Sequence, residues 1–308
     1  MSLINKVKKI IKYFTDRDYR FLKHAQLGFY NHLSDEEYIT RKFKATIGEN
    51  PDLNNPKTFN EKLQWLKLYD RKPICTTMVD KYEAKRYVAG IIGEEYIIPT
   101  LGAWDNFDEI DFDSLPNQFV LKCTHDSGGL VICRDKKTLN LKKARKKIEK
   151  SLKRNFYYTS REWPYKNVKP RIIAEKYMED TSNKDGLVDY KFYCFGGEAK
   201  FLYVSQGLEN HATASISFLT TEWEFAPYER TDYKPLDKLP QKPVNFEKMK
   251  DICRVLAKDI PFLRVDLYEI NGQIYFSELT FTPAAGFMKF KNPEHDKEIG
   301  DMLELPEK

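Results

Sequence analysis

The sequence predicts an α+β protein with antiparallel sheets, and three observations lead to this class. Residues 1 to about 90 carry apolar side chains at helical spacing, whereas short strand-like runs follow from about residue 116. Two turn signals, Gly196-Gly197 and Asn271-Gly272, join neighbouring runs into hairpins. A helix from residue 246 to about 259 separates the hairpins, so helices and sheets are both expected in the second half.

The N-terminal part of the chain is expected to be mostly helical. A Ser or Thr cap followed three residues later by Glu satisfies two backbone amides at once, and such capping boxes mark helix starts. The two boxes pair Ser34 with Glu37 and Thr58 with Glu61.

A further helix and six strands are expected after this region. The helix runs from residue 79 to about 92 and ends near a glycine. The strands are short apolar runs rich in β-branched and aromatic residues. They comprise residues 96–99, 119–122, 130–132, 171–174, 191–195 and 199–204.

The composition indicates a globular protein with a mild positive charge. The chain has 308 residues, 41% of them hydrophobic, so it can form two or three lobes with cores. Its net charge of +5 suits an anionic ligand such as a nucleotide, but the chain lacks the concentrated basic surface of a nucleic-acid binder. The densest basic run, residues 142–154, predicts a solvated helix face, with a polyanion or membrane contact as the alternative.

The cysteines and the apolar pattern favour a cytoplasmic location. Five cysteines without a CxxC pair lie in apolar stretches, as expected for reduced, packed thiols. No apolar run is long enough to span a bilayer, and no signal peptide is recognised. Residues 1–15 form a basic amphipathic helix that is expected to dock on the protein's own body, with peripheral membrane contact as the alternative.

The first candidate site is a lysine beside a glycine turn. Lys122 ends one strand-like run, and Ser127, Gly128 and Gly129 lead into the next. Two adjacent glycines let the backbone approach a ligand and turn its N–H groups toward phosphate oxygens, while the lysine supplies a point charge. The alternative is a plain hairpin turn whose lysine reaches toward solvent.

The second candidate site is the C-terminal hairpin. A strict two-residue turn would place Asp266 opposite Ser277, whereas a three-residue loop places Asp266 opposite Glu278. Two carboxylates facing each other in an apolar setting are costly unless a cation lies between them, and hard oxygen ligands favour magnesium. Arg264 shares a face with Asp266 and is suited to a phosphate or oxyanion. The alternative is a solvated hairpin with an Arg–carboxylate pair.

The third candidate site follows the strand-like run at residues 171–174. Glu175, Tyr177 and Met178 come directly after it, and backbone groups there are suited to an adenine ring. Beyond a polar loop, Asp189 is suited to ribose hydroxyls and Lys191 to a phosphate. The alternative is a set of ordinary surface charges beside a strand.

Taken in order, these segments resemble the ATP-grasp superfamily, and more closely its TupA-like family, which is named for teichuronopeptide synthesis. The resemblance runs from about residue 45 to the end, and the ordered set of segments is specific although each one is common. The segments are residues 55–70, 80–88, 122–129, 264–268 and 276–283.

The resemblance implies ATP and Mg²⁺ as cofactors and a role for each candidate residue. Lys122, the Ser127–Gly129 turn and Lys191 would contact phosphates, while Glu175, Tyr177 and Met178 would lie at the adenine and Asp189 at the ribose. Arg264 would stabilise the anionic intermediate, with Lys122 and Lys191 also assisting catalysis. Asp266 and Glu278 would hold magnesium, with Thr280 replacing the asparagine that the superfamily usually places there.

The resemblance also implies two α+β lobes that clasp ATP between antiparallel sheets, preceded by a mostly helical region. The expected divisions are an N-terminal helical region at 1–75, a linker segment at 76–115, a small lobe at 116–180 and a large lobe with the metal site at 181–308.

The implied activity is a carbon–nitrogen ligase that converts ATP to ADP and phosphate through an acylphosphate. Its substrates would be a carboxylate-bearing glycan or sugar nucleotide and an amine or amino acid, in the synthesis of a bacterial capsular or other surface polysaccharide. Other enzymes of that synthesis are candidate partners, and nucleic acid is not. The alternatives are a kinase acting on a sugar or amide, and a non-catalytic nucleotide- or glycan-binding partner.

Overall fold

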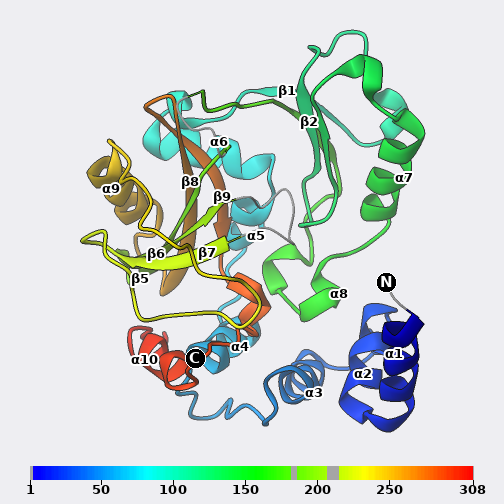
Figure 1. Cartoon of the computed structure of the whole chain (residues 1–308), viewed down its shortest axis with the longest axis vertical. Coiled ribbons are helices and arrows are strands. Elements are labelled where there is room, and N and C mark those ends of the chain that lie inside the picture. The colour runs from blue at the N-terminus through cyan, green and yellow to red at the C-terminus, as the bar shows by residue number, and fades with distance from the viewer. Residues whose placement is uncertain (1–2, 182–185, 207–214, 308) are drawn as a thin grey trace.

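The computed structural model describes residues 3–181, 186–206 and 215–307, and within them the chain forms two antiparallel sheets with helices around them. The α+β class with antiparallel sheets is therefore confirmed. Figure 1 shows the sheets side by side, with the first helices gathered at one end of the molecule. These N-terminal helices are α1 (Leu3–Thr15), α2 (Arg17–Gln26), α3 (Asp35–Ile47) and α4 (Phe59–Tyr69).

The smaller sheet has four strands in the order β1-β4-β2-β3, and every neighbouring pair is antiparallel. One helix, α7 (Leu141–Leu152), packs against it through Ala144 and Ile148, which join the core formed by Phe119 and Leu121. The lysines of α7 stay exposed, as their spacing predicts. The strands are β1 (Thr100–Trp104), β2 (Phe119–Cys123), β3 (Leu130–Cys133) and β4 (Ile172–Lys176).

The larger sheet has five strands in the order β7-β6-β5-β8-β9, again all antiparallel. They are β5 (Asp189–Phe195), β6 (Glu198–Gln206), β7 (Ser215–Thr220), β8 (Phe262–Ile270) and β9 (Gln273–Thr280).

Helices cover both faces of the larger sheet, because β5 is apolar on both sides. Phe192 and Cys194 pack toward α6 (Glu83–Ile92) and α9 (Phe246–Leu256), whereas Tyr193 and Phe195 pack toward α4 and α10 (Glu294–Asp301). This alternation follows from the two-residue period of a strand. Figure 1 shows α9 and α6 beside and above this sheet, with α4 and α10 below it. The middle strands are thus held rigidly from both sides.

Both predicted hairpin turns are present and contain two residues. Residues Gly196 and Gly197 have φ of 55° and 90°, and Asn271 and Gly272 have φ of 52° and 78°. Positive φ at both central residues belongs to the turn type that matches the twist of antiparallel strands. Of the predicted capping boxes, the one at Thr58 is complete; at Ser34 the side chain accepts the Glu37 amide.

Two predictions around residue 80–100 were wrong. The helix expected from residue 79 to about 92 begins only at Glu83, as α6, because Asp80 adopts an extended backbone and its carboxylate accepts the Tyr82 amide. A separate short helix, α5 (Ile74–Val79), precedes it. The strand expected at 96–99 is a 3-10 turn, Glu94–Tyr96, followed by one isolated bridge from Ile97 to Phe276. The strand β1 begins only after Pro99, which has no amide to donate.

Candidate active site

The C-terminal hairpin, β8 and β9, places the two expected metal-binding carboxylates opposite each other. Asp266 pairs with Glu278, although the turn has two residues and Ile270 pairs with Gln273. A bulge between Asp266 and Leu267 supplies the extra residue that shifts the register. The facing arrangement was expected, but from a three-residue loop, and that loop length was wrong.

A guanidinium group lies between these two carboxylates. The Arg264 Nε atom donates to Asp266 Oδ1 at 2.7 Å, and its Nη2 atom donates to Asp266 Oδ2 at 2.7 Å and to Glu278 Oε1 at 2.8 Å. The same Nη2 atom lies 3.0 Å from Thr280 Oγ1. A cation is therefore present where the facing carboxylates require one, and in this structure it is Arg264.

The neighbouring strand β5 extends the charged network. Lys191 Nζ lies 2.5 Å from Asp266 Oδ2 and 2.5 Å from Asp189 Oδ2. The other oxygen of Asp189, Oδ1, is buried and has no hydrogen-bond partner within the described part of the chain. A buried acceptor of this kind is suited to a ligand hydroxyl.

The two facing carboxylates differ in their affinity for protons. Burial alone would raise the pKa of Glu278, but Lys191, Arg264 and Lys81 hold it at about 2. Burial raises the pKa of Asp266 to about 6, against the lowering effect of Arg264 and Lys191. Glu278 is therefore fully ionised at neutral pH, and Asp266 is the first of the pair to be protonated on acidification.

On the smaller sheet, Glu175 holds two lysines together. Glu175 on β4 is buried and lies 2.5 Å from Lys85 Nζ and 2.5 Å from Lys122 Nζ. Burial lowers the pKa of Lys122, but Glu175, Tyr268 and Glu278 outweigh it and raise that pKa. Because Tyr268 and Glu278 belong to the C-terminal hairpin, Lys122 lies within electrostatic range of the carboxylate pair.

The glycine turn after β2 is held by an aspartate. The Gly128 and Gly129 amides donate to Asp126 Oδ1 at 3.2 and 3.0 Å, so in this structure they face that carboxylate. Ser127 and Gly128 are exposed, whereas Gly129 is buried. A methyl group at Gly129 would lie 2.5 Å from Cys123 Sγ, so the position admits only glycine.

One functional candidate, Lys81, was not assigned a role from the sequence. Its Nζ atom donates to the Asp126 carbonyl at 2.6 Å, and it lowers the pKa of Glu278. Lys81 therefore connects the glycine turn to the hairpin carboxylates. Its place in the segment 80–88 was the available signal, whereas Arg86 in the same segment is exposed and pairs only loosely with Glu83 at 3.9 Å.

The residues expected at the adenine lie at the end of β4. Tyr177 and Met178 are half-buried, and the Tyr177 hydroxyl accepts a hydrogen bond from Arg134 Nε at 3.2 Å. Glu175, two residues before Tyr177 and within β4, points into the lysine pair described above. The three residues are thus close in the chain, but in this structure the Glu175 carboxylate forms ion pairs with Lys85 and Lys122.

A second buried polar cluster, which the sequence did not reveal, adjoins Arg264. Glu162 accepts from Thr282 Oγ1 at 2.5 Å, and Lys67 Nζ donates to the Ala285 carbonyl at 2.6 Å. Burial raises the pKa of Glu162, while Lys67, Lys42 and Arg264 act to lower it. Ala284 and Ala285, just after β9, have φ of 50° and 54°, so this network holds a strained turn beside the hairpin.

The donor chemistry at the hairpin fits magnesium. Asp266, Glu278 and Thr280 all offer hard oxygen atoms, and Mg²⁺ is often bound by one or two carboxylates together with substrate phosphates. Within residues 3–181, 186–206 and 215–307 there is no group of three or more His, Cys, Asp or Glu residues that could hold a metal. Arg264 occupies the space between Asp266 and Glu278 in this structure.

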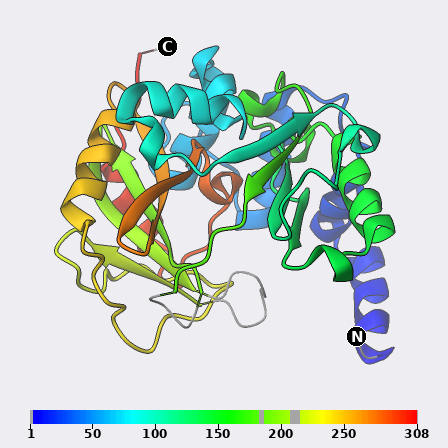
Figure 2. The same cartoon turned by 90° about the horizontal axis from the view of Figure 1, so that it is seen from above.

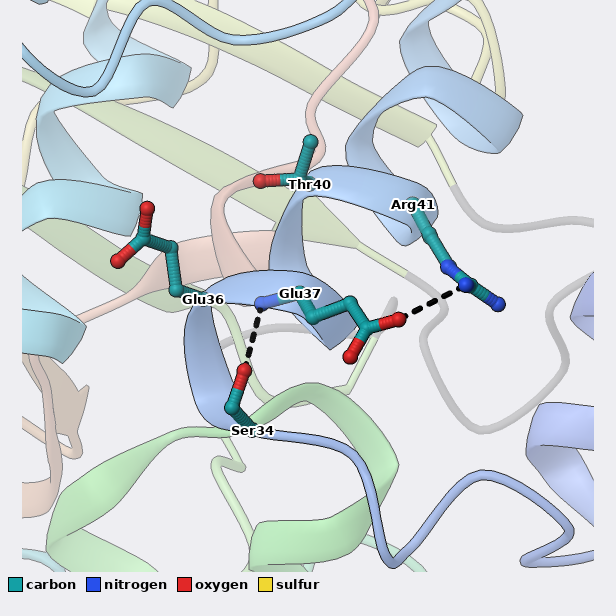
Figure 3. A pocket seen from close by; sticks show the side chains of 5 residues that line it. All are labelled: Ser34, Glu36, Glu37, Thr40 and Arg41. Atoms are coloured by element: carbon teal, nitrogen blue, oxygen red, sulfur yellow. Dashed lines mark hydrogen bonds and ion pairs between the residues drawn. The ribbon is translucent and has the colours of Figure 1, made fainter.

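A surface hollow away from the candidate site is formed by residues at the N-terminus of α3. It lies at the beginning of α3 (Figure 3). There the Glu37 amide donates to Ser34 Oγ at 3.2 Å, and Glu37 Oε1 lies 2.8 Å from Arg41 Nη2. None of the candidate residues lines it. The lining residues are Ser34, Glu36, Glu37, Thr40 and Arg41.

Comparison with known proteins gives one family match and several distant structures. The family described as TupA-like ATPgrasp matches residues 61–304. No curated protein matches the sequence.

The structural similarities are remote. A D-alanine–D-alanine ligase from Bacillus anthracis complexed with ATP is 14% identical, with a TM-score of 0.37 over 66% of this chain and 53% of that one. The Helicobacter pylori D-alanine–D-alanine ligase is 15% identical, with a TM-score of 0.40 over 80% and 69%. The ATP-grasp ligase PsnB with a minimal precursor is 11% identical, with a TM-score of 0.37 over 72% and 59%. The match thus spans about half the length of the first of these structures.

Proposed function

Because this chain belongs to the TupA-like ATP-grasp family and has the ATP-grasp fold, we propose that it is an ATP-dependent carboxylate–amine ligase. One observation carries the proposal: two facing carboxylates, Asp266 and Glu278, lie in one network of ion pairs with the cations Arg264 and Lys191 and within electrostatic range of Lys122. Asp266, Arg264 and Lys191 are buried, whereas Glu278 is partly exposed. Placing so many charges together in a largely buried site is costly, and such groups are typical of sites that bind a highly charged ligand.

The proposed nucleotide site lies between the lobes at residues 116–180 and 181–308. Lys122, Lys191 and the turn of Ser127, Gly128 and Gly129 contact the phosphates. In this binding mode the glycine amides exchange Asp126 for phosphate oxygens, a change that retains their hydrogen bonds.

The nucleoside is proposed to lie along the end of β4 and the start of β5. Tyr177 and Met178 contact the adenine, Glu175 beside them holds Lys122 and Lys85, and Asp189 accepts a hydrogen bond from a ribose hydroxyl. The buried, unpartnered Asp189 Oδ1 atom supports this assignment, because a ribose donor satisfies it.

In the proposed reaction, a substrate carboxylate oxygen attacks the γ-phosphorus of ATP and the bond to the β–γ bridging oxygen breaks, which yields an acylphosphate and ADP. The amine then attacks the acyl carbon, loses a proton, and displaces phosphate. Lys122 and Lys191 position the phosphates and offset their charge, and Arg264 stabilises the oxyanion of the tetrahedral intermediate. Asp266, Glu278 and Thr280 would hold Mg²⁺, which supplies further charge neutralisation when bound.

The proposed acceptor is a uronic acid of a glycan or sugar nucleotide, and the amine is an amino acid or another amine, in bacterial capsular or surface polysaccharide synthesis. The family resemblance supports this substrate class. The second candidate function is a kinase for a sugar or amide, because the same phosphate contacts serve direct phosphoryl transfer. A non-catalytic nucleotide- or glycan-binding role is the third.

Product analysis distinguishes these three functions. The full-length protein is incubated with ATP, Mg²⁺ and panels of uronic acids, nucleotide sugars and amino acids, and ADP release is followed. A new amide with free phosphate identifies a ligase, and a phosphorylated acceptor identifies a kinase. The variant Asp266→Asn is expected to lose turnover by at least about 100-fold while keeping its fold, whereas the exposed control Asp237→Asn keeps it. Full turnover in Asp266→Asn would remove the support for this site.

A further inference from the structure

The first helix, α1, presents an apolar face that no part of the described chain covers. Val7, Ile10, Ile11 and Phe14 are 49%, 58%, 56% and 73% exposed. Their spacing of three and four residues places them on one side of a helix. Exposed large apolar side chains grouped in this way mark a surface that meets an apolar partner.

The contacts of α1 with α2 explain why this face stays open. The Tyr13 hydroxyl lies 2.6 Å from His24 Nε2, and Arg20 Nη1 donates to the carbonyls of Tyr13 and Phe14 at 3.0 and 3.1 Å. These contacts use Tyr13 and the last turn of α1. The expected docking on the protein's own body therefore takes place on α2 and leaves the apolar stripe exposed. In Figure 2 α1 extends away from the rest of the molecule.

The charge of α1 is entirely positive. Leu3–Thr15 contains four lysines, Lys6, Lys8, Lys9 and Lys12, and no acidic residue. Lys8 and Lys12 are exposed, and Lys12 reaches Asp16 only at 3.7 Å on an exposed surface. A short helix with an apolar stripe and a basic remainder complements a surface that is apolar inside and negatively charged outside.

This combination selects one occupant. A second copy of the chain would bring two lysine-rich helices together, and their charges would repel. At about 1.5 Å per residue the 13-residue helix is about 20 Å long, which is too short to cross a bilayer. No helix within the described residues is long and apolar enough to cross one.

We propose that α1 docks on an anionic membrane surface, with Val7, Ile10, Ile11 and Phe14 inserted at the boundary between headgroups and acyl chains. The lysines contact the negative headgroups, and the helix axis lies parallel to the membrane. Docking through α1 holds the rest of the protein at the membrane. The inference rests on the geometry of α1 and does not depend on the proposed ligase activity.

Vesicle sedimentation of the full-length protein tests this proposal. Binding is measured to vesicles of phosphatidylcholine alone and of phosphatidylcholine with roughly a third phosphatidylglycerol. The protein is expected to bind the anionic vesicles, and more weakly as salt is raised. The double variant Ile10→Ser/Phe14→Ser is expected to bind about tenfold more weakly or worse. The control Val244→Ser removes an apolar residue outside α1 that is even more exposed, at 87%, and is expected to keep binding.

Two further measurements make the outcome decisive. Circular dichroism and thermal unfolding establish that each variant is folded, independently of any enzymatic activity. The double variant Lys8→Glu/Lys12→Glu is expected to lose the preference for anionic vesicles. The proposal is overturned if the unaltered protein ignores anionic vesicles, or if both apolar substitutions leave vesicle binding unchanged. It is also overturned if light scattering shows a dimer that the Ile10→Ser/Phe14→Ser change dissociates, since α1 would then bind a second copy.

Discussion

Removing the charge of Glu175 tests the electrostatics of the smaller sheet. Burial alone would raise the pKa of Glu175, but Lys122 and Lys85 lower it from 4.5 to about 2. The difference of about 2.5 between these values corresponds to roughly 3 kcal/mol of stability. Since the carboxylate is only 5% exposed, solvent screens the pairs little. Because the folded-state pKa is the lower one, this stabilisation is present above about pH 4.5 and is lost as the pH falls toward 2.

The substitution Glu175→Gln isolates this contribution. Urea unfolding at a series of pH values from about 7 down to about 3 gives the free energy of unfolding for both proteins. The unaltered protein is expected to be about 3 kcal/mol more stable from neutral pH down to about pH 5, with a gap that narrows as the pH falls below about 4.5. The exposed control Glu298→Gln is expected to show no gap. A gap for Glu175→Gln that stays constant over the whole pH range would refute the reasoning.

Three further substitutions test individual contacts. Arg264→Lys keeps a positive charge but loses the fork that spans Asp266 and Glu278, so ligase turnover is expected to fall about 100-fold in an ADP-release assay. Gly129→Ala places a methyl group 2.5 Å from Cys123 Sγ and is expected to lower the free energy of unfolding by about 1 to 3 kcal/mol, measured in urea. Lys67→Met removes the ammonium group that donates to the buried Ser160 carbonyl at 3.0 Å and to the Ala285 carbonyl at 2.6 Å, and is expected to cost roughly 2 kcal/mol in thermal unfolding, whereas the same change at exposed Lys44 is neutral.

Much of the fold could be predicted because it depends on local chemistry. The two hairpins follow from Gly196-Gly197 and Asn271-Gly272, whose residues accept the positive φ that the turns require. The alternation in β5 likewise follows from side chains that are apolar on both faces. The break at Asp80 could not be predicted, because there a side chain competes with the helix for backbone amides.

Within the candidate site, side-chain contacts could be predicted most directly where two residues share a strand pair. Asp266, Glu278 and Arg264 belong to one hairpin. The sequence left open only whether Asp266 pairs with Ser277 or with Glu278. The bulge that sets the register is a three-dimensional feature of the twisted strands, with no signal in the turn. Glu162 and Lys67 come from distant parts of the chain and are brought to this region by packing. Their spacing along the sequence therefore could not predict that they lie close together.

Arg264 lies between the carboxylates of Asp266 and Glu278. It neutralises the two carboxylates, since leaving them unpaired would be costly where Asp266 is fully buried. Nucleotide-bound magnesium would take over that role and release the guanidinium toward the reacting carboxylate. The proposed function therefore requires Arg264 to change partners when substrate binds.

A crystal structure of the protein with Mg²⁺ and a non-hydrolysable ATP analogue tests most directly whether Asp266 and Glu278 bind the metal and Arg264 changes partners. The account predicts a metal ion about 2.0 to 2.1 Å from oxygen atoms of both Asp266 and Glu278, triphosphate oxygens within hydrogen-bond distance of Lys122, and Arg264 withdrawn from between the carboxylates. A nucleotide bound elsewhere, or a bound triphosphate with Arg264 still bridging Asp266 and Glu278, would contradict it.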